Sequence, residues 1–596
     1  MERDDPATRE RLWPTLLIGW LIASAILILV MATPIAKLDF ADPDDAMRLA
    51  EVRDWLAGQS WWDVSQHRLW GGHFVMHWSR LVDLPLAAGM TLLDPLVGQQ
   101  WSTRITLTVV PLLSLLAIMA LVGVITRRVA GIDTARLAIL LTPLPIPLMS
   151  QIRPVRIDHH AWQVTLALAA VAALLARPNA RSGAIAGAAL ATLLAISLEG
   201  MPITAAILGV TALAWALIPE RCVQLAAMAA SLPVTLLLLH IATRGPNALA
   251  PACDAIAPAW LAAIGVGTGG ILIATALAPR SPVARLAMLA LAGLAAVATI
   301  RWLAPVCTRG PFATLDPLVY RYWYLSVGEG RPIWVQTGLM AVVTLTLPVI
   351  GLIGGALAWR ASRGETRVSW SMLIAIALAA LCLCLFVLRA GATANALALP
   401  GAAWLLERLR DRARNAPRVS TRIAAGAGAF VALAPGFLGS ALIGSMTPAG
   451  RAAAAAAARE THPSCVFIDE MPHLARLPIS TLFAPIDMAP MLLAHTDHRA
   501  IGAGYHRDAH AIHYVMATFM AQPPEARIRL LRSGADYLVA CPGANETDLY
   551  KAVAPKGLWA RLERGERFDW LQPVDLHGAI RAWRIVRPLH SGSHGR

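Results

Sequence analysis

The chain has 596 residues, of which 57% are hydrophobic and 15% charged, and its mean hydropathy is +0.57. These values exclude a soluble globular protein of this length and indicate a polytopic α-helical membrane protein. The formal net charge of +14 is typical of arginines in cytoplasmic loops, so we do not take it as a sign of nucleic-acid binding.

Apolar runs long enough to cross a bilayer recur along the first three quarters of the chain, and we expect about thirteen spans. They begin near Trp13, Ile105, Leu137, Ala161, Ser182, Met201, Cys222, Trp260, Val283, Val335, Met372, Ala394 and Arg422. The first run carries no small-residue cleavage site, so we expect a retained anchor rather than a cleaved signal.

Arginines gather in alternate connections, and these loops are expected to face the cytoplasm. They lie at 127–136, 177–181, 280–285, 360–367 and 407–422. The remaining connections then face the other side of the membrane, and the important ones are 34–104, 153–160 and 304–334. The sequence therefore predicts a transmembrane domain over residues 1–443 whose chemically active loops are periplasmic.

The composition changes after this domain, and residues 444–588 predict a small periplasmic α/β domain. Short strand-like runs occur at Cys465–Ile468 and Tyr537–Ala540, and helical stretches at His513–Met520 and Pro524–Arg532. Residues 589–596 are expected to form a disordered tail.

The seven cysteines show no metal-binding spacing. Cys253 and Cys307 fall in outer loops, and Cys465 and Cys541 in the outer domain. In an oxidising compartment each pair is a candidate disulfide, although spacing alone does not decide it.

An acidic stretch follows the first span directly, from Asp42 through Pro43, Asp44 and Asp45 to Arg48. Carboxylates at the mouth of a membrane helix must face water. Two interpretations stay open. Asp42 is either the cap of a helix that has Pro43 at its first position, with two acids in the first turn, or part of a cation site.

The second outer loop contains Arg156, Asp158, His159 and His160. Carboxylate oxygen and neutral imidazole both coordinate metals of intermediate hardness, so the Asp-His-His run is a candidate metal or acid–base set. A helix-capping aspartate beside two interfacial histidines is the alternative. Glu199 lies at a junction between spans, where an unpaired acid is costly, and it is a functional candidate by default.

The fifth outer loop is rich in aromatic residues and contains the run Ser326-Val327-Gly328-Glu329. Arg389 lies at the outer end of a later span. Snorkelling to the interface would explain this arginine, but its planar guanidinium also suits a phosphate, which it can bind through two nitrogens.

These motifs occur in one order and on one predicted face, and together they resemble the catalytic subunit of oligosaccharyltransferase and, more broadly, the GT-C membrane glycosyltransferases. The Asp-Pro-x-x-x-x-Arg turn, Asp-His-His, Ser-Val-x-Glu and the late arginine carry the resemblance over about residues 10–440. The Asp-His-His run is most similar to the archaeal members.

The resemblance implies roles for these residues. Asp42 would bind a divalent metal (Mg²⁺ or Mn²⁺) and contact the acceptor, and Asp158 with His159 or His160 would add ligands. Glu329 would reach the acceptor or the metal. Arg389 would hold the phosphate of a polyprenyl-linked sugar donor.

One motif of the family is missing. The sequon-reading Trp-Trp-Asp-Tyr-Gly does not occur in the C-terminal domain, and the one Trp-Trp-Asp, at Trp61, lies in the first loop. The acceptor is therefore expected to be a glycan, a lipid or another protein group. Tyr505, His506 and Arg507 of the outer domain are candidate substrate contacts, and a solvated loop is the alternative.

The sequence thus predicts a membrane glycosyltransferase that uses a lipid-linked donor at the periplasmic face. A transporter or flippase is the main alternative, because Glu199 and Arg389 could line a substrate path. A transporter should place such groups at mid-membrane in inverted repeats, and a scaffold would not need acids gathered at one face.

Overall fold

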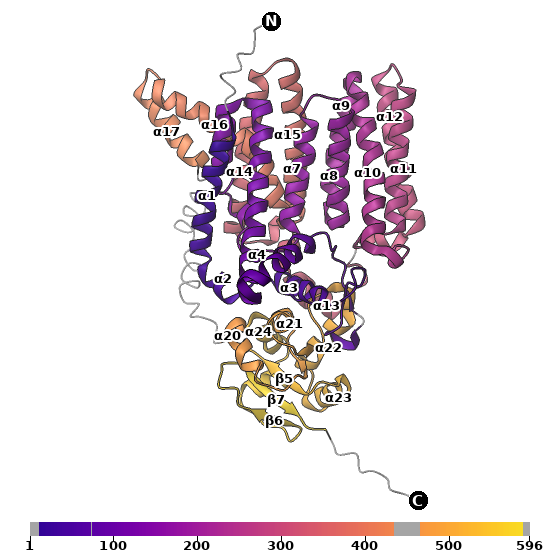
Figure 1. Cartoon of the computed structure of the whole chain (residues 1–596), viewed down its shortest axis with the longest axis vertical. Coiled ribbons are helices and arrows are strands. Elements are labelled where there is room, and N and C mark those ends of the chain that lie inside the picture. The colour runs from indigo at the N-terminus through magenta and orange to yellow at the C-terminus, as the bar shows by residue number, and fades with distance from the viewer. Residues whose placement is uncertain (1–10, 73, 311, 434–464, 588–596) are drawn as a thin grey trace, which may run out of the picture. The chain divides into compact units, whose positions relative to one another are not determined.

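The computed structural model describes residues 11–72, 74–310, 312–433 and 465–587, and it divides the chain into two compact units (Figure 1). The first unit comprises residues 1–35, 78–311 and 328–454. The second unit comprises residues 36–77, 312–327 and 455–596. It therefore combines the C-terminal region with pieces of the first and fifth outer loops.

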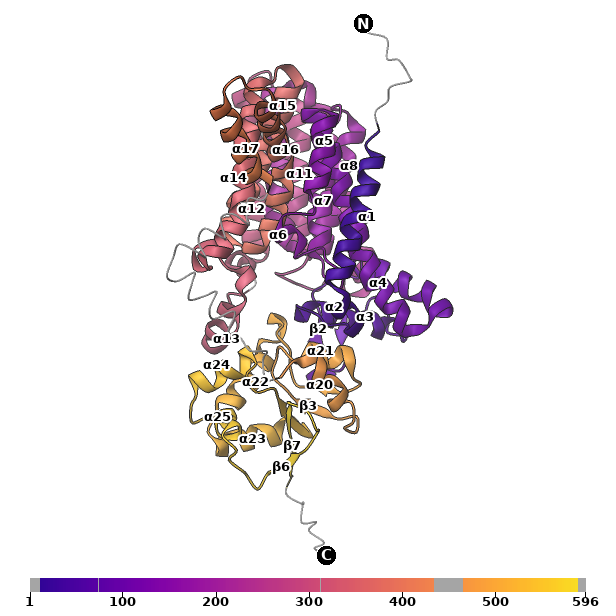
Figure 2. The ribbon, with the colours of Figure 1, turned by 90° about the vertical axis from the view of Figure 1, so that its left-hand side faces the viewer.

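The first unit is helical throughout its described part, and its long helices run side by side (Figures 1 and 2). The longer helices are α1 (Trp13–Val30), α4 (Asp83–Ala130), α5 (Ile132–Leu141), α7 (His160–Leu174), α8 (Ala180–Ile196), α9 (Met201–Leu217), α10 (Cys222–Arg244), α11 (Pro258–Leu277), α12 (Pro282–Leu303), α14 (Gly338–Ala361), α15 (Gly364–Phe386), α16 (Gly391–Asn415) and α17 (Val419–Leu433). The short helices are α2 (Ala32–Lys37), which ends in the second unit, and α6 (Ile146–Met149).

Each of the thirteen apolar runs of the sequence overlaps one of these helices. The run from Leu137 continues past the end of α5 through a turn into α6, and the run from Arg422 extends beyond Leu433, where this described stretch ends. Eight helical segments among the described residues are long and apolar enough to cross a membrane, with α7 and α8 shorter at 15 and 17 residues. The chain is thus a multi-pass membrane protein, and thirteen spans remain a prediction.

Glycines let two pairs of helices approach closely. A side chain on Gly183 or Gly187 of α8 would collide with the backbone of α10. Gly354 of α14 and Gly401 of α16 have the same role between these two helices. A side chain on either glycine would collide with a backbone carbonyl of the other helix. Small residues at such contacts allow van der Waals packing between helices that share no hydrophobic driving force in lipid.

A buried polar side chain, that of Asn395, fixes helix α16, which follows Arg389. The side-chain nitrogen Nδ2 of Asn395 donates to Thr344 O of α14 at 3.0 Å and to Gly391 O at 2.8 Å. Asn395 is fully buried, so this amide ties the start of α16 to its neighbour.

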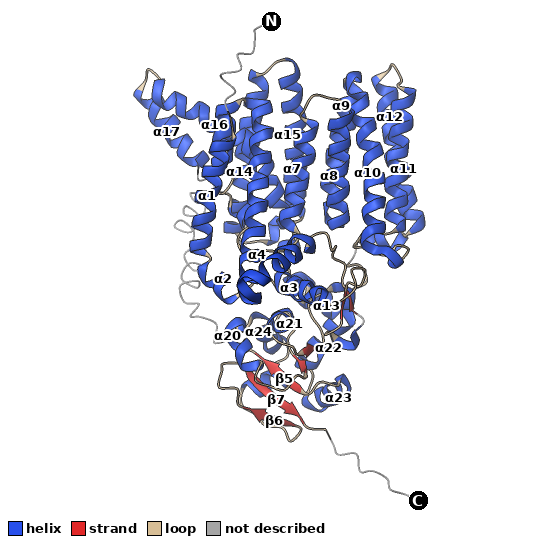
Figure 3. Ribbon diagram, viewed as in Figure 1, coloured by secondary structure: helices blue, strands red, loops and turns tan. Residues whose placement is uncertain are grey.

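The second unit contains a five-stranded sheet of order β4-β3-β5-β7-β6 (Figure 3). Strands β3, β4 and β5 are parallel, whereas β7 and β6 are antiparallel to their neighbours. The strands are β3 (Thr481–Phe483), β4 (Arg499–Ala500), β5 (Tyr537–Ala540), β6 (Leu571–Val574) and β7 (Arg581–Ile585). The helices of the C-terminal region are α20 (Phe467–Leu474), α21 (Ala489–His495), α22 (Ala509–Met520), α23 (Pro523–Ser533), α24 (Asn545–Val553) and α25 (Leu558–Glu563).

Part of the first outer loop packs onto this sheet unit. It contributes α3 (Pro43–Leu56) and the two-stranded ribbon of β1 (Ser65–Gln66) and β2 (Phe74–Val75), and the fifth loop adds α13 (Pro317–Tyr322). Arg53 donates to Ala494 O at 2.6 Å, Arg68 donates to Thr496 O at 2.9 Å, and Ala500 N donates to Arg68 O at 2.9 Å. The loop is therefore part of the folded unit rather than a free connection.

One predicted strand is wrong. Residues 467–474 form helix α20, because Ile468, Met471 and Leu474 repeat at helical spacing and all three are buried. Tyr537–Ala540 is a strand, as predicted. The predicted boundary at residue 444 and the tail from residue 589 lie outside the described residues.

Both candidate disulfides are formed. Cys253 pairs with Cys307, with 4.9 Å between Cα atoms, and Cys465 pairs with Cys541, with 5.5 Å. The spacing along the chain could not reveal this, because pairing depends on where the fold places each Cβ.

Candidate active site

The predicted site residues divide equally between the two units. The first unit holds Arg156, Asp158, His159, His160, Glu199, Glu329 and Arg389. The second unit holds Asp42, Asp44, Asp45, Arg48, Tyr505, His506 and Arg507.

A strained turn presents the Asp-His-His run. Val155 has a positive φ of 63°, which is rare for a β-branched residue and costs about 1–3 kcal/mol. Its amide donates to Leu107 O on α4 at 2.9 Å, which anchors the turn. The chain then enters α7 at His160. Strain of this kind is retained where the surrounding structure holds a segment in a required geometry.

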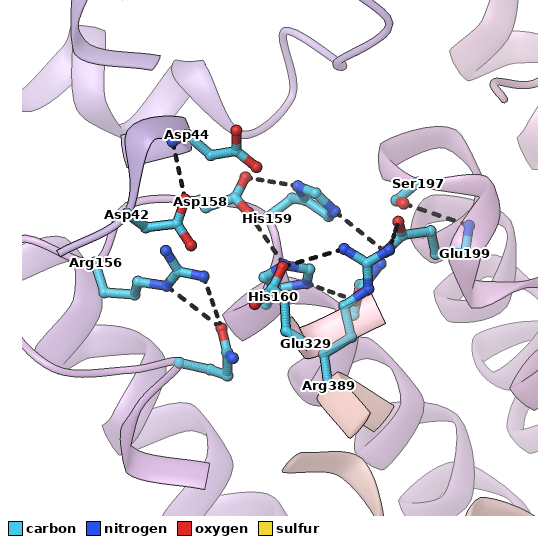
Figure 4. Close-up of polar contacts among 12 residues, drawn as sticks. Asp42, Asp44, Arg156, Asp158, His159, His160, Ser197, Glu199, Glu329 and Arg389 are labelled. Atoms are coloured by element: carbon cyan, nitrogen blue, oxygen red, sulfur yellow. Dashed lines mark hydrogen bonds and ion pairs between the residues drawn. The ribbon is translucent and has the colours of Figure 1, made fainter. Parts of the chain in front are cut away.

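Asp158 lies between the two imidazoles (Figure 4). Its Oδ1 is 2.6 Å from Nδ1 of His159, and its Oδ2 is 3.3 Å from Nε2 of His160. The exposed side-chain fractions of these residues are 0%, 8% and 5%. One ligand atom of each residue lies within 4.8 Å of the others, so the three could hold one metal ion.

Arg389 joins two further carboxylates to this group (Figure 4). Its Nη2 lies 2.5 Å from Oε1 of Glu199, and its Nη1 lies 3.3 Å from Oε1 of Glu329. The other oxygen of Glu199 is 3.8 Å from Nε2 of His159. Six predicted residues from four separate segments therefore form one network, which we call the carboxylate–imidazole cluster: Asp158, His159, His160, Glu199, Glu329 and Arg389.

Short turns hold the two ends of this network. Glu199 lies in the turn Leu198–Gly200, where its amide donates to Ser197 Oγ at 3.4 Å. Arg389 lies in the turn Leu388–Ala390, and Leu388 N donates to Arg331 O at 3.1 Å. This last bond ties the turn of Arg389 to the loop of Glu329.

The electrostatics of the cluster favour a cation. Three carboxylates and one guanidinium give the cluster a formal charge of −2 when both imidazoles are neutral. Burial opposes a charge on His159, but Asp158 and Glu199 outweigh it and raise the pKa of His159 to about 9. At neutral pH His159 therefore carries a proton and the cluster a charge of −1, and a metal that binds His159 would displace this proton. The Nε2 atom of His159 is buried and has no hydrogen-bond partner among the described residues. These donors fit a divalent metal with mixed oxygen and nitrogen ligands.

Arg156 has a different partner. It is buried, and its guanidinium donates to Oε1 of Gln151 from Nη2 at 3.2 Å and from Nε at 3.4 Å (Figure 4). We therefore regard Arg156 as a support of the 151–158 turn.

The residues in the second unit have local roles there. Asp42 caps α3 by accepting from Asp44 N at 3.0 Å, with Pro43 at the first position, which confirms the helix-cap interpretation (Figure 4). Asp45 and Arg48 are buried along the same helix.

The candidate contacts of the C-terminal region also pack within the second unit. Tyr505 is buried, and the His506 ring lies 4.9 Å from that of His77. Arg507 Nη1 donates to the carbonyls of Val75 and Met76 at 3.3 Å. These three residues therefore fasten the first-loop ribbon to the sheet region.

Sequence reasoning missed three polar residues. Gln151 binds Arg156, and Gln163 binds His160. Asp487 lies near Asp42, since withdrawal from water and the Asp42 carboxylate raise the pKa of Asp487 to about 6. The spacing of Gln163, three residues after His160 on one helix, is a signal that could have identified it.

Sequence comparison identifies no relative: no protein-family model matches the chain, and no curated protein matches it. Structural comparison does identify relatives. The archaeal oligosaccharyltransferase AglB from Archaeoglobus fulgidus, in complex with an inhibitory peptide and a dolichol-phosphate, aligns with a TM-score of 0.66 and 13% identity over 96% of this chain and 75% of that one. The chain shares the fold of this oligosaccharyltransferase.

Two other structures of the A. fulgidus oligosaccharyltransferase show the same fold. The apo form aligns with a TM-score of 0.66 and 14% identity over 89% of this chain and 70% of that chain. The complex with Zn and sulfate aligns with a TM-score of 0.59 and 14% identity over 96% and 73%. At this identity the likeness establishes the fold of the chain and leaves its chemistry to be argued from its own residues.

Proposed function

We propose that the chain is a membrane glycosyltransferase that moves a sugar or an oligosaccharide from a polyprenyl-phosphate or polyprenyl-diphosphate donor to an acceptor. The carboxylate–imidazole cluster, within an oligosaccharyltransferase-type fold, is the observation that carries this proposal. The A. fulgidus enzyme has been solved with a dolichol-phosphate and, separately, with Zn and sulfate, which supports a lipid-linked donor and a metal here.

The residues of the cluster suit a divalent metal held by Asp158, His159 and His160. When bound, such a metal supplies Lewis-acid stabilisation of the charge that grows on the departing phosphate. Two imidazoles favour Mn²⁺ over Mg²⁺, since Mg²⁺ prefers oxygen ligands and octahedral geometry.

Arg389 is the donor-phosphate residue in this proposal. Its side chain is 21% exposed, and its guanidinium holds Glu199 with one terminal nitrogen and Glu329 with the other. A guanidinium that two carboxylates hold in place is preorganised, so it can stabilise a phosphate oxygen without reorganising during the reaction. Glu329, 31% exposed, is the cluster carboxylate placed on a loop that an acceptor could meet.

The reaction breaks the bond between the anomeric carbon and the phosphate oxygen, and the electron pair of that bond stays on the phosphate. A nucleophilic atom of the acceptor forms the new bond to the anomeric carbon and loses its proton to a carboxylate. We assign that carboxylate to Asp42, on the sequence resemblance alone. The missing sequon motif leads us to propose a glycan, a lipid or another protein group as acceptor rather than an Asn-x-Ser/Thr peptide.

We place the reaction at the periplasmic face of a bacterial inner membrane, with the C-terminal domain on the same side. The alternation of arginine-rich connections supports this orientation. The disulfides Cys253–Cys307 and Cys465–Cys541 support it as well, because both are expected in an oxidising compartment.

Mass spectrometry of lipid-linked sugars and surface glycans tests the proposal in a strain that lacks the chain and in strains complemented with Asp158→Ala or Asp42→Ala. The expected result is accumulation of one lipid-linked donor and loss of one glycan product, with neither variant restoring transfer although both insert into the membrane. If both variants still transfer the sugar, the proposal that the chain is a glycosyltransferase with this active site is refuted. Donor confined to the cytoplasmic leaflet would instead identify a flippase.

A further inference from the structure

Gln163 lies one helical turn after His160 on α7 and contacts its imidazole. The amide oxygen Oε1 is 3.2 Å from Nδ1 of His160. An amide oxygen can only accept a hydrogen bond, so Nδ1 of His160 carries the proton in this contact. Since the imidazole is buried, the state of its second nitrogen is set by this bond.

The second nitrogen of His160 then presents its lone pair to Asp158. Nε2 and Oδ2 are 3.3 Å apart, and both are acceptors when the imidazole is neutral. Two acceptors at this distance repel each other unless a cation binds to both of them. His159 uses its nitrogens the other way round, because its Nδ1 faces Asp158 Oδ1 at 2.6 Å and its Nε2 faces Glu199.

The side-chain amide of Gln163 does not contribute to α7 as an apolar side chain would, so helix stability alone does not explain its presence. Its Nε2 atom is buried without a hydrogen-bond partner among the described residues. A buried donor left unsatisfied costs about 1–3 kcal/mol, so an apolar residue here would make the helix more stable. A residue retained at such a cost is expected to serve the site beside it.

We propose that Gln163 is a positioning residue that holds His160 in the Nδ1–H tautomer, so that His160 Nε2 and Asp158 Oδ2 together coordinate the divalent metal. This rests on the metal site of the proposed function and adds a division of labour between the two histidines. His160 is a ligand through Nε2, and His159 in addition holds the other oxygen of Asp158 through Nδ1. Partners that fix a ligand's tautomer typically contribute about 10–100-fold to metal affinity.

Titration of the full-length protein in nanodiscs with Mn²⁺, followed by electron paramagnetic resonance and by the thermal midpoint, tests this role. Gln163→Leu should weaken Mn²⁺ binding about 10–100-fold while leaving the metal-free midpoint equal or higher. Gln163→Glu should keep the affinity, since its carboxylate also accepts from Nδ1. Thr165→Val is the matched control, because Thr165 lies on the same helix and bonds only its own backbone at Ala161 O among the described contacts.

The outcomes separate this role from the metal site itself. If Asp158→Ala and His160→Ala abolish Mn²⁺ binding but Gln163→Leu does not weaken it, the positioning role is refuted and the metal site stands. If none of these variants changes Mn²⁺ binding, the metal site of the proposed function is refuted too. A Gln163→Leu variant that melts earlier with unchanged affinity would assign Gln163 a structural role, contrary to the proposal.

Discussion

Lowering the pH should detach the segment that leads to Asp42 from helix α21. His495 ends α21, and its Nε2 donates to Leu38 O at 3.1 Å. Burial lowers the pKa of His495 to about 4 from 6.5; the bond to Leu38 opposes this shift, and Arg53 adds to it. A base whose pKa is depressed by folding contributes stability above its unfolded pKa and loses it as the pH falls.

The size of the effect follows from these two values. At pH 5 a released imidazole is almost fully protonated, whereas the packed one is still mostly neutral, so release becomes more favourable by about 2 kcal/mol. This corresponds to about 30-fold less protection against local opening. Hydrogen exchange of the full chain, followed by mass spectrometry at pH 7.5 and pH 5 and corrected for intrinsic rates, should show it in peptides spanning residues 38–56.

His495→Gln is the matched control, because glutamine keeps a donor for Leu38 O and does not titrate. Asp39 lies in the same segment, and burial and then Asp469 raise its pKa, which gives a pH dependence of opposite sign. The variant should therefore lose the acid-induced opening and keep the contribution of Asp39. Equal loss of protection in the wild type and in His495→Gln would refute the reasoning.

Three further predictions concern the site and the fold. Arg389→Lys keeps the positive charge but loses the planar guanidinium, and it should reduce the amount of glycan product about 10²-fold in a complemented strain. Arg389→Gln should reduce it further. A wild-type amount of product from either variant would contradict the phosphate-binding role. Gly401→Val should abolish the close contact of α14 and α16 and lower the thermal midpoint in nanodiscs, whereas Gly209→Val, in open space, should not. Replacing Cys465 and Cys541 by serine should destabilise the second unit by about 4 kcal/mol through the lost 76-residue link, with Cys382→Ser as a neutral control in chemical denaturation.

Local patterns in the sequence were enough for the helices and for the identity of the cluster. Apolar runs of twenty residues must be helical in lipid, since every backbone group has to be hydrogen-bonded internally, and each predicted run overlaps a helix. Ionisable residues are so costly near hydrocarbon that Glu199 and Arg389 stood out without a structure. The cap at Asp42 was likewise readable, because a cap involves only neighbouring residues.

The tertiary structure decided which of these residues meet. Arg389 and Glu199 are 190 positions apart, and only the packing of the helices brings their side chains to 2.5 Å. The strand expected at 465–468 is absent, and its last two residues begin helix α20, because buried contacts outweigh β-propensity in short segments. The first-loop segment joined the C-terminal sheet through backbone bonds such as Ala500 N to Arg68 O, which leave no trace in the side-chain pattern. Sequence periodicity reports local geometry, whereas pairing between distant segments depends on the free energy of the whole packed chain.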